Sequence, residues 1–262
     1  MVQVQNVVPP MFLAHGAPTL AIDDTPARRF LKTLSSSLPT PRFIVILSAH
    51  WETDGVKLSA PGPLRTYHDF AGFPQQLHDI FYPAVSDEMS VDEVAQMLEM
   101  NGYDVELDDQ HGLDHGAWVP LSLVFPKSDV PVVAISLPIG SSPQSVHKIG
   151  RTLAPLANKG VLIIGSGSTT HNLRKMDPNG SDVPAFVSDF DTWLDDGLKS
   201  SSIEYFEGLE RQPDFRLNHP TNEHLLPLFF AFGAADPGAK PDLMHRSYEY
   251  AALSMSYFRF AA

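Results

Sequence analysis

Five histidines lie in short, turn-like contexts spread along most of the chain. They are His15 in LAHGAP, His50 in LSAHWE, His115 in LDHGAW, His171 in STTHNL and His224 in NEHLLP. His15, His50 and His171 each follow an apolar, β-branched or small-residue run that is typical of a strand. Because ligands bind at the carboxyl ends of strands in open α/β sheets, we expect these imidazoles to meet in one crevice. The pattern predicts a mononuclear metal site.

The absence of cysteine limits the chemistry of such a site. Disulfides, Cys-ligated zinc, iron–sulfur clusters and thiol nucleophiles are excluded, so nitrogen and oxygen must hold any metal. Imidazole also suits proton transfer, which makes His171 either a fourth ligand or a general base. The Asp114 carboxylate can orient the His115 ring or favour its protonated, charged form. Alternatively, the Asp–His pair only holds a loop in place.

For the other candidate residues, a purely structural role is the alternative to a functional one. His224 is a candidate ligand near the predicted start of a helix; alternatively, it is a helix-start residue with no function. His219, in NHP, is a second candidate for the same ligand position. The glycine-rich turn 165–168 (GSGS) lacks the lysine of a P-loop, and no GxSxG elbow surrounds its serines. We expect its glycines to permit a close approach of the backbone.

Short apolar runs are expected to carry these histidines. The candidate strands are residues 11–14, 43–49, 132–137 and 161–164, and the candidate helices are 24–34, 91–101 with Ser90 as cap, 143–156, 184–198 and 223–232. The strands look buried on both faces, and their alternation with helices predicts βα units in one domain. The stretch 60–83 is rich in Pro, Gly and aromatic residues and predicts an ordered binding loop.

The charge of the chain argues against two classes of partner. Its 262 residues include 18 Lys and Arg against 31 Asp and Glu, for a net charge of -13. No basic stripe is available to neutralise nucleic-acid phosphates or to bind an anionic membrane. The N-terminal stretch does not read as a secretory signal, and no run approaches the roughly 18 apolar residues that span a bilayer. We expect a cytoplasmic protein, either a monomer or a small homo-oligomer.

Six segments carry a resemblance to a known family. They are LAHGAPTL, VILSAHWET, YHDFAGFP, GLDHGAWVPL, VLIIGSGSTTHNLR and NEHLLPLFFAFGA. In this order and at these separations they resemble the DODA-type (4,5-DOPA extradiol dioxygenase-like) branch of the LigB-like class III extradiol ring-cleaving dioxygenases. The resemblance covers nearly the whole chain. It implies a single-domain, three-layer α/β/α fold over residues 1–262, with a central, mostly parallel mixed sheet.

The resemblance also implies a non-haem Fe²⁺ centre, at which Zn²⁺ can replace iron in crystals. The implied metal ligands are His15, His50 and His224. In protocatechuate-cleaving relatives the third ligand is a glutamate, so the usual triad of two histidines and one carboxylate becomes three imidazoles here. His171 matches an acid–base histidine that approaches as a fourth ligand in zinc-loaded relatives, and His115 matches one that contacts substrate or oxygen. Ala17 is a departure, because relatives often have serine there.

The implied reaction inserts both atoms of O2 into a catechol, such as DOPA, caffeate or a smaller catecholic acid, next to the paired hydroxyls. Three imidazoles on one face of the ion leave about three positions open for the substrate and O2. Aromatic side chains are expected to surround the ring of the catechol and exclude water from it. These expected substrate-binding residues are Trp51, His68, Phe70, Phe73 and Tyr82.

Two alternatives from other classes remain. A zinc hydrolase would use the same nitrogens to lower the pKa of bound water. A non-catalytic interaction protein is the other alternative, since Memo-type proteins resemble this fold without known ring cleavage.

Overall fold

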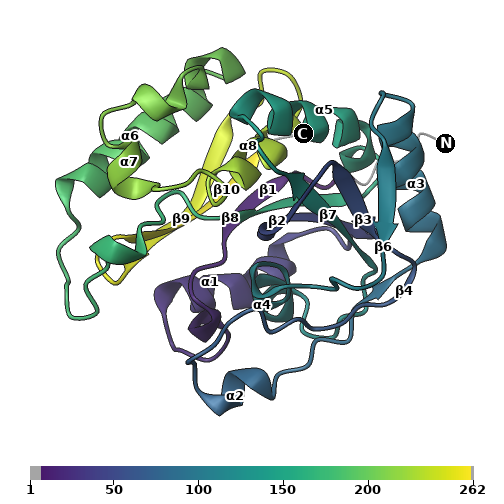
Figure 1. Ribbon diagram of the computed structural model, residues 1–262, viewed down its shortest axis with the longest axis horizontal. Coiled ribbons are helices and arrows are strands. Elements are labelled where there is room, and N and C mark those ends of the chain that lie inside the picture. Colours follow the sequence, from purple (N-terminus) through teal and green to yellow (C-terminus); the bar gives the residue numbers. More distant parts are fainter. Residues whose placement is uncertain (1–6, 261–262) are drawn as a thin grey trace.

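The computed structural model describes residues 7–260, so both ends of the expected domain lie outside the described residues. An eight-stranded sheet crosses the molecule in the order β6-β3-β7-β2-β8-β1-β10-β9 (Figure 1). Its strands are β1 (Met11–Ala14), β2 (Ile44–Thr53), β3 (Val56–Ser59), β6 (Val105–Asp108), β7 (Val132–Pro138), β8 (Leu162–Gly167), β9 (Pro241–Glu249) and β10 (Leu253–Phe260). The central strands β7, β2, β8 and β1 are parallel, whereas β9 and β10 form an antiparallel hairpin. The predicted mixed, mostly parallel sheet is confirmed.

Helices cover both faces of this sheet. Side chains alternate along β2, so that Ile44 and Ile46 join one apolar cluster while Val45 and Leu47 join the other. One face carries α3 (Glu88–Glu99), α5 (Pro143–Ala157), α6 (Ala185–Lys199) and α8 (Leu226–Gly233), and the other carries α1 (Pro26–Leu34) and α4 (His115–Val124) (Figure 1). The shorter elements are β4 (Gly62–Pro63), α2 (Gln75–His78), β5 (Val85–Ser86) and α7 (Phe215–Asn218). The three-layer α/β/α architecture is therefore confirmed, and the four predicted strand segments, in β1, β2, β7 and β8, are buried on both faces as expected.

Local sequence signals explain the helix that matches its prediction best. The Ser142 hydroxyl accepts a hydrogen bond from the backbone N–H of Ser145, and the Ser145 hydroxyl accepts one from the backbone N–H of Ser142, which closes a capping box. Pro143 occupies the first turn, where its missing N–H costs nothing. The apolar positions of α5 then recur at helical spacing and are buried against the sheet and α8.

Several predicted boundaries were wrong. Strand β2 continues through His50 to Thr53 instead of ending before the histidine. Helix α3 begins at Glu88, because the Asp87 carboxylate, rather than Ser90, accepts the N-terminal hydrogen bond at 3.0 Å. Helix α8 begins at Leu226 instead of at residue 223. Strand β8 continues through Gly167, so most of the expected turn 165–168 is strand paired with β1 and β2.

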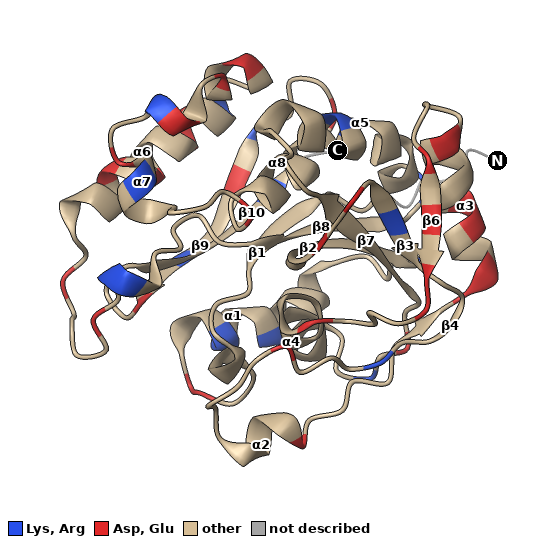
Figure 2. Cartoon of the chain, in the orientation of Figure 1, with Lys and Arg blue, Asp and Glu red and all other residues tan. Residues whose placement is uncertain are grey.

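Charged side chains are scattered over the described surface. Figure 2 shows acidic positions along α3 and β6 and no continuous band of basic positions in this view. Within residues 7–260, no helix is both long and apolar enough to cross a bilayer.

Candidate metal centre

The central parallel strands bring distant histidines to one edge of the sheet. His15 directly follows β1, and His50 lies in β2 beyond the point where its regular pairing with β7 is interrupted. His224 is fixed beside the end of β8, because its carbonyl accepts a hydrogen bond from Ser168 N at 2.7 Å. Since β1, β2 and β8 are parallel neighbours, their carboxyl ends coincide. The predicted convergence in one crevice is therefore found.

The ring nitrogens of these histidines lie at the spacing of ligands on one ion. Nε2 of His50 is 3.1 Å from Nε2 of His15 and 3.2 Å from Nε2 of His224. Two nitrogens that each bind an ion at about 2.1 Å lie about 3.0–3.4 Å apart for bond angles between octahedral and tetrahedral. The ring centroids of His15 and His224 are 5.4 Å apart. Nε2 of His50 is thus at the spacing of two ligands from both Nε2 of His15 and Nε2 of His224.

Hydrogen bonds at Nδ1 of His15 and His224 determine which ring nitrogen of each carries the free lone pair. The Ser166 hydroxyl donates to the Gly116 carbonyl, so Nδ1–H of His15 must be the donor in its 3.1 Å contact with Ser166. Nδ1–H of His224 donates to the Glu223 carboxylate at 2.9 Å. Both Nε2 atoms therefore carry lone pairs, and His50 Nε2 can supply at most one proton to them. A divalent cation would accept all three nitrogens, so the donor set fits a metal.

Burial keeps these rings neutral, as metal ligands must be. Desolvation, followed by repulsion from the neighbouring histidines, holds the pKa values of His15 and His224 well below the ordinary value. For His50, burial and the nearby His115 lower the pKa to about 4. The three rings are available as neutral nitrogen ligands at neutral pH.

We expect the metal-free protein to lose stability as the pH falls. The unfolded chain binds protons on these histidines as the pH passes below 6.5, whereas the folded chain resists protonation down to about 4 for His50. Because the unfolded state then binds more protons, the free energy of unfolding decreases through this window. Urea unfolding of chelator-treated protein between about pH 7.5 and about pH 5 should show a falling midpoint. A midpoint that stays constant would contradict the buried, neutral cluster.

His115 is oriented by a carboxylate that the sequence reading missed. Its Nδ1 lies 2.9 Å from both oxygens of Asp69, and its backbone N–H donates to the same carboxylate. The expected partner Asp114 instead caps α4 and binds Ser48 at 2.6 Å and His111 at 3.1 Å. The prediction that Asp114 orients His115 was therefore wrong. Asp69 lies in the YHDF segment, between His68 and Phe70, and only those two neighbours were predicted to contact the substrate.

A cavity of about 390 Å³ opens beside the cluster, and His50, His115 and His171 contribute to its wall. The His171 ring stacks on His224, with centroids 3.5 Å apart and planes at 7°. Burial lowers the pKa of His171, so its ring is a neutral base at neutral pH. Its position lets it act on a molecule that occupies the cavity.

The expected aromatic wall is only partly present. Phe70 and Phe73 line the cavity, but Trp51, His68 and Tyr82 do not. Trp51 is buried and stacks on His111 at 4.6 Å, and Nε2 of His68 bonds the Ile80 carbonyl. The Tyr82 hydroxyl donates to the Phe125 carbonyl at 3.1 Å. Trp51, His68 and Tyr82 thus stabilise the loop. The prediction that these three residues line the substrate cavity was wrong.

His219 and the glycines of β8 have structural roles: His219 forms a hydrogen bond to the backbone, and the glycines allow close backbone contacts. Nε2 of His219 bonds the Thr169 carbonyl at 2.8 Å, away from the cluster, so His224 rather than His219 joins it. A Cβ on Gly165 or Gly167 would meet the Pro227 or His224 carbonyl at 1.8 or 2.1 Å. The expected close approach of the backbone at these glycines is confirmed.

Two separate sets of groups can hold a metal. Ligand atoms of His15, His50 and His115 lie within 4.8 Å of one another, and so do those of His171, Glu223 and His224. His50 joins the two sets through its 3.2 Å contact with His224. Because Nε2 of His224 lies at the spacing of two ligands from Nε2 of His50, we favour His224 as the third ligand. His115 instead lines the neighbouring cavity.

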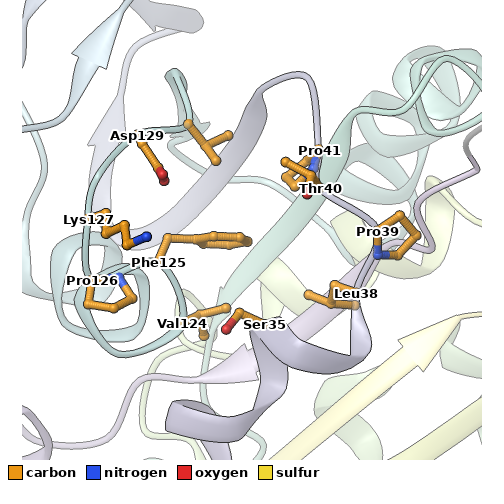
Figure 3. Close-up of a pocket in the computed structure, with 11 residues that line it drawn as sticks. Ser35, Leu38, Pro39, Thr40, Pro41, Val124, Phe125, Pro126, Lys127 and Asp129 are labelled. Atoms are coloured by element: carbon orange, nitrogen blue, oxygen red, sulfur yellow. The ribbon is translucent and has the colours of Figure 1, made fainter.

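A second hollow, of about 280 Å³, lies at the opposite end of the strands (Figure 3). Its walls are the segments 35–41 and 124–130, which precede β2 and β7. Lys127 and Asp129 are its charged residues, and no histidine lines it. This hollow lacks the ligand chemistry of the histidine cluster.

Comparison with known proteins identifies the family. Residues 8–261 match the family described as the catalytic LigB subunit of aromatic ring-opening dioxygenase. The chain belongs to the LigB family. Among LigB relatives, a 4,5-DOPA dioxygenase extradiol of Beta vulgaris is 36% identical over 98% of both chains, and one of Escherichia coli (strain K12) is 34% identical over 95% of this chain and 93% of its own. An uncharacterised protein of Escherichia coli K12 has a crystal structure that superposes with a TM-score of 0.79, at 28% identity over 96% of this chain and 99% of that one. The resemblance inferred from six segments is confirmed.

Proposed function

We propose that this LigB chain is an Fe(II)-dependent extradiol dioxygenase that opens the ring of a catechol. One observation carries the proposal: Nε2 of His50 lies 3.1 and 3.2 Å from Nε2 of His15 and His224, beside a cavity that His171 lines. The same nitrogens suit Zn²⁺, which is therefore an alternative occupant. When bound, ferrous iron supplies the redox chemistry by which both atoms of O2 enter an aromatic ring.

The residues of the chain position the substrate and move its protons. The catechol enters the cavity with its hydroxyls toward the histidines. His171 takes up the proton of one hydroxyl as the substrate binds and returns a proton during ring opening, because its ring is neutral at neutral pH. His115 is held by Asp69 and directs its other nitrogen at the substrate. Phe70 and Phe73 exclude water from the ring.

Oxygen uptake tests this function. Protein reconstituted anaerobically with Fe(II) is mixed with a catechol and then with O2. We expect one O2 consumed per catechol, a yellow ring-opened product, and both atoms of ¹⁸O2 in that product. Protein loaded with zinc should consume no O2. An iron-loaded protein that consumes no O2 with any catechol, while the zinc-loaded form hydrolyses esters or amides, would favour the hydrolase alternative.

A further inference from the structure

The cavity beside the histidines has an uncharged wall. Apart from His50, His115 and His171, its side chains are almost entirely apolar, and within residues 7–260 none of its lining residues is Asp, Glu, Lys or Arg. Its volume of about 390 Å³ falls at the small end of ligand sites, which span about 300–1,000 Å³. A bound molecule would therefore contact apolar groups wherever it does not contact the histidines. The apolar lining residues include Pro18, Leu173, Met176, Pro178 and Leu253.

Two segments that pack on each other form one part of the apolar wall. Residues 173–178 follow His171, and the turn 250–252 joins β9 to β10. Asp177 N donates to the Tyr250 carbonyl at 2.9 Å, which ties the two segments together. Tyr250 has a positive φ of 51°, and this tight turn places it and Leu253 in the wall. This hydrogen bond and the turn hold the two segments against each other.

The nearest carboxylates make the cavity unfavourable for an anion. Asp69 and Glu223 are bound to His115 and His224, just behind the lining. Glu249 lies behind Gly16, where an added Cβ would come within 3.6 Å of its carboxylate. Arg174 is exposed and is not part of the wall, although it follows Leu173 in sequence. A substrate carboxylate would lose its hydration without gaining a cationic partner.

We propose that the cavity selects catechols whose ring substituent is uncharged and apolar, such as an alkyl chain, over catechols that carry a carboxylate or an ammonium group. This inference rests on the proposed function, because it assumes that the hydroxyls face the histidines. The substituent then extends toward Leu173, Met176 and Leu253, where neither charge has a partner. An ammonium group would also lose its hydration, and among the described residues no Asp or Glu lines the cavity to pair with it.

Matched catechols test the inference. We would measure the Kd of 4-propylcatechol, 3,4-dihydroxyphenylpropionate and dopamine for the iron-loaded protein by calorimetry without O2, and then kcat/KM by oxygen uptake. The neutral compound should bind at least about tenfold more tightly and show the higher kcat/KM. If O2 is consumed but the charged compounds bind equally well or better, the inference is overturned and the dioxygenase proposal stands. If the binding preference is found without oxygen uptake, the dioxygenase proposal fails and the preference stands.

A charge placed in the wall provides a second test. Leu173 lines the cavity and is 65% exposed, so Leu173→Arg should fold normally and offer a cation to a substrate carboxylate. We expect the ratio of the two Kd values to shift by about tenfold toward the propionate. Leu107→Arg, on β6 and 54% exposed, is the matched control and should leave the ratio unchanged. A folded Leu173→Arg protein with the wild-type ratio would show that the substituent does not reach this wall.

Discussion

His50→Ala is expected to lose bound iron and, with it, all measurable ring cleavage. Nε2 of His50 is the nitrogen that lies next to both other proposed ligands, at 3.1 Å from His15 and 3.2 Å from His224. Its removal leaves two imidazoles, which provide neither the affinity nor the geometry of a facial triad. Changing residues that only support ligands typically costs about 10–100-fold in metal affinity, so loss of a ligand should cost at least about 100-fold.

Iron content after reconstitution and oxygen uptake would measure this loss. His147→Ala is the matched control, because His147 lies on α5 against Phe232, outside the cluster. The control should keep its iron and its activity. A folded His50→Ala protein that still binds one iron per chain with wild-type affinity would be incompatible with the proposed ligand set.

His171→Ala should keep at least part of the iron and lose turnover. The His171 ring lies over His224 and lines the cavity, and its lowered pKa makes it a base at neutral pH. Losing a general acid–base group typically slows a reaction by about 10²–10⁴-fold, and we expect kcat to fall by this amount. Metal analysis and single-turnover kinetics on the same sample separate the two effects. Normal turnover with normal iron content would remove the acid–base role, whereas complete loss of iron would make His171 a ligand.

The parts of the fold that the sequence predicted best have strong local signals. Strand β1 and helix α5 match because an apolar run, a capping serine and a first-turn proline act within a few residues. His15 and His50 were predictable for a related reason, since each comes at or near the end of an apolar run that forms a central strand. The close approach of His15 and His50 could then be predicted, because the carboxyl ends of parallel strands lie at the same edge of a sheet.

Long-range contacts explain what the sequence did not predict. Asp69 orients His115 across 46 positions of sequence, and nothing near Asp69 distinguishes it from a solvent-exposed acid. Tyr82 looked like a cavity residue because it belongs to an aromatic loop, yet its hydroxyl bonds a carbonyl 43 positions away. Strands β9 and β10 were missed as well. β9 is an edge strand that is only partly buried, so its residues lack the apolar run that marked the central strands.

Anomalous diffraction at the iron edge, from crystals grown anaerobically with Fe(II), would show which histidines bind the metal. We expect one peak, about 2.1 Å from each of the Nε2 atoms of His15, His50 and His224. A peak bonded to His115 but remote from His224, or no peak among these residues, would contradict the proposed ligand set.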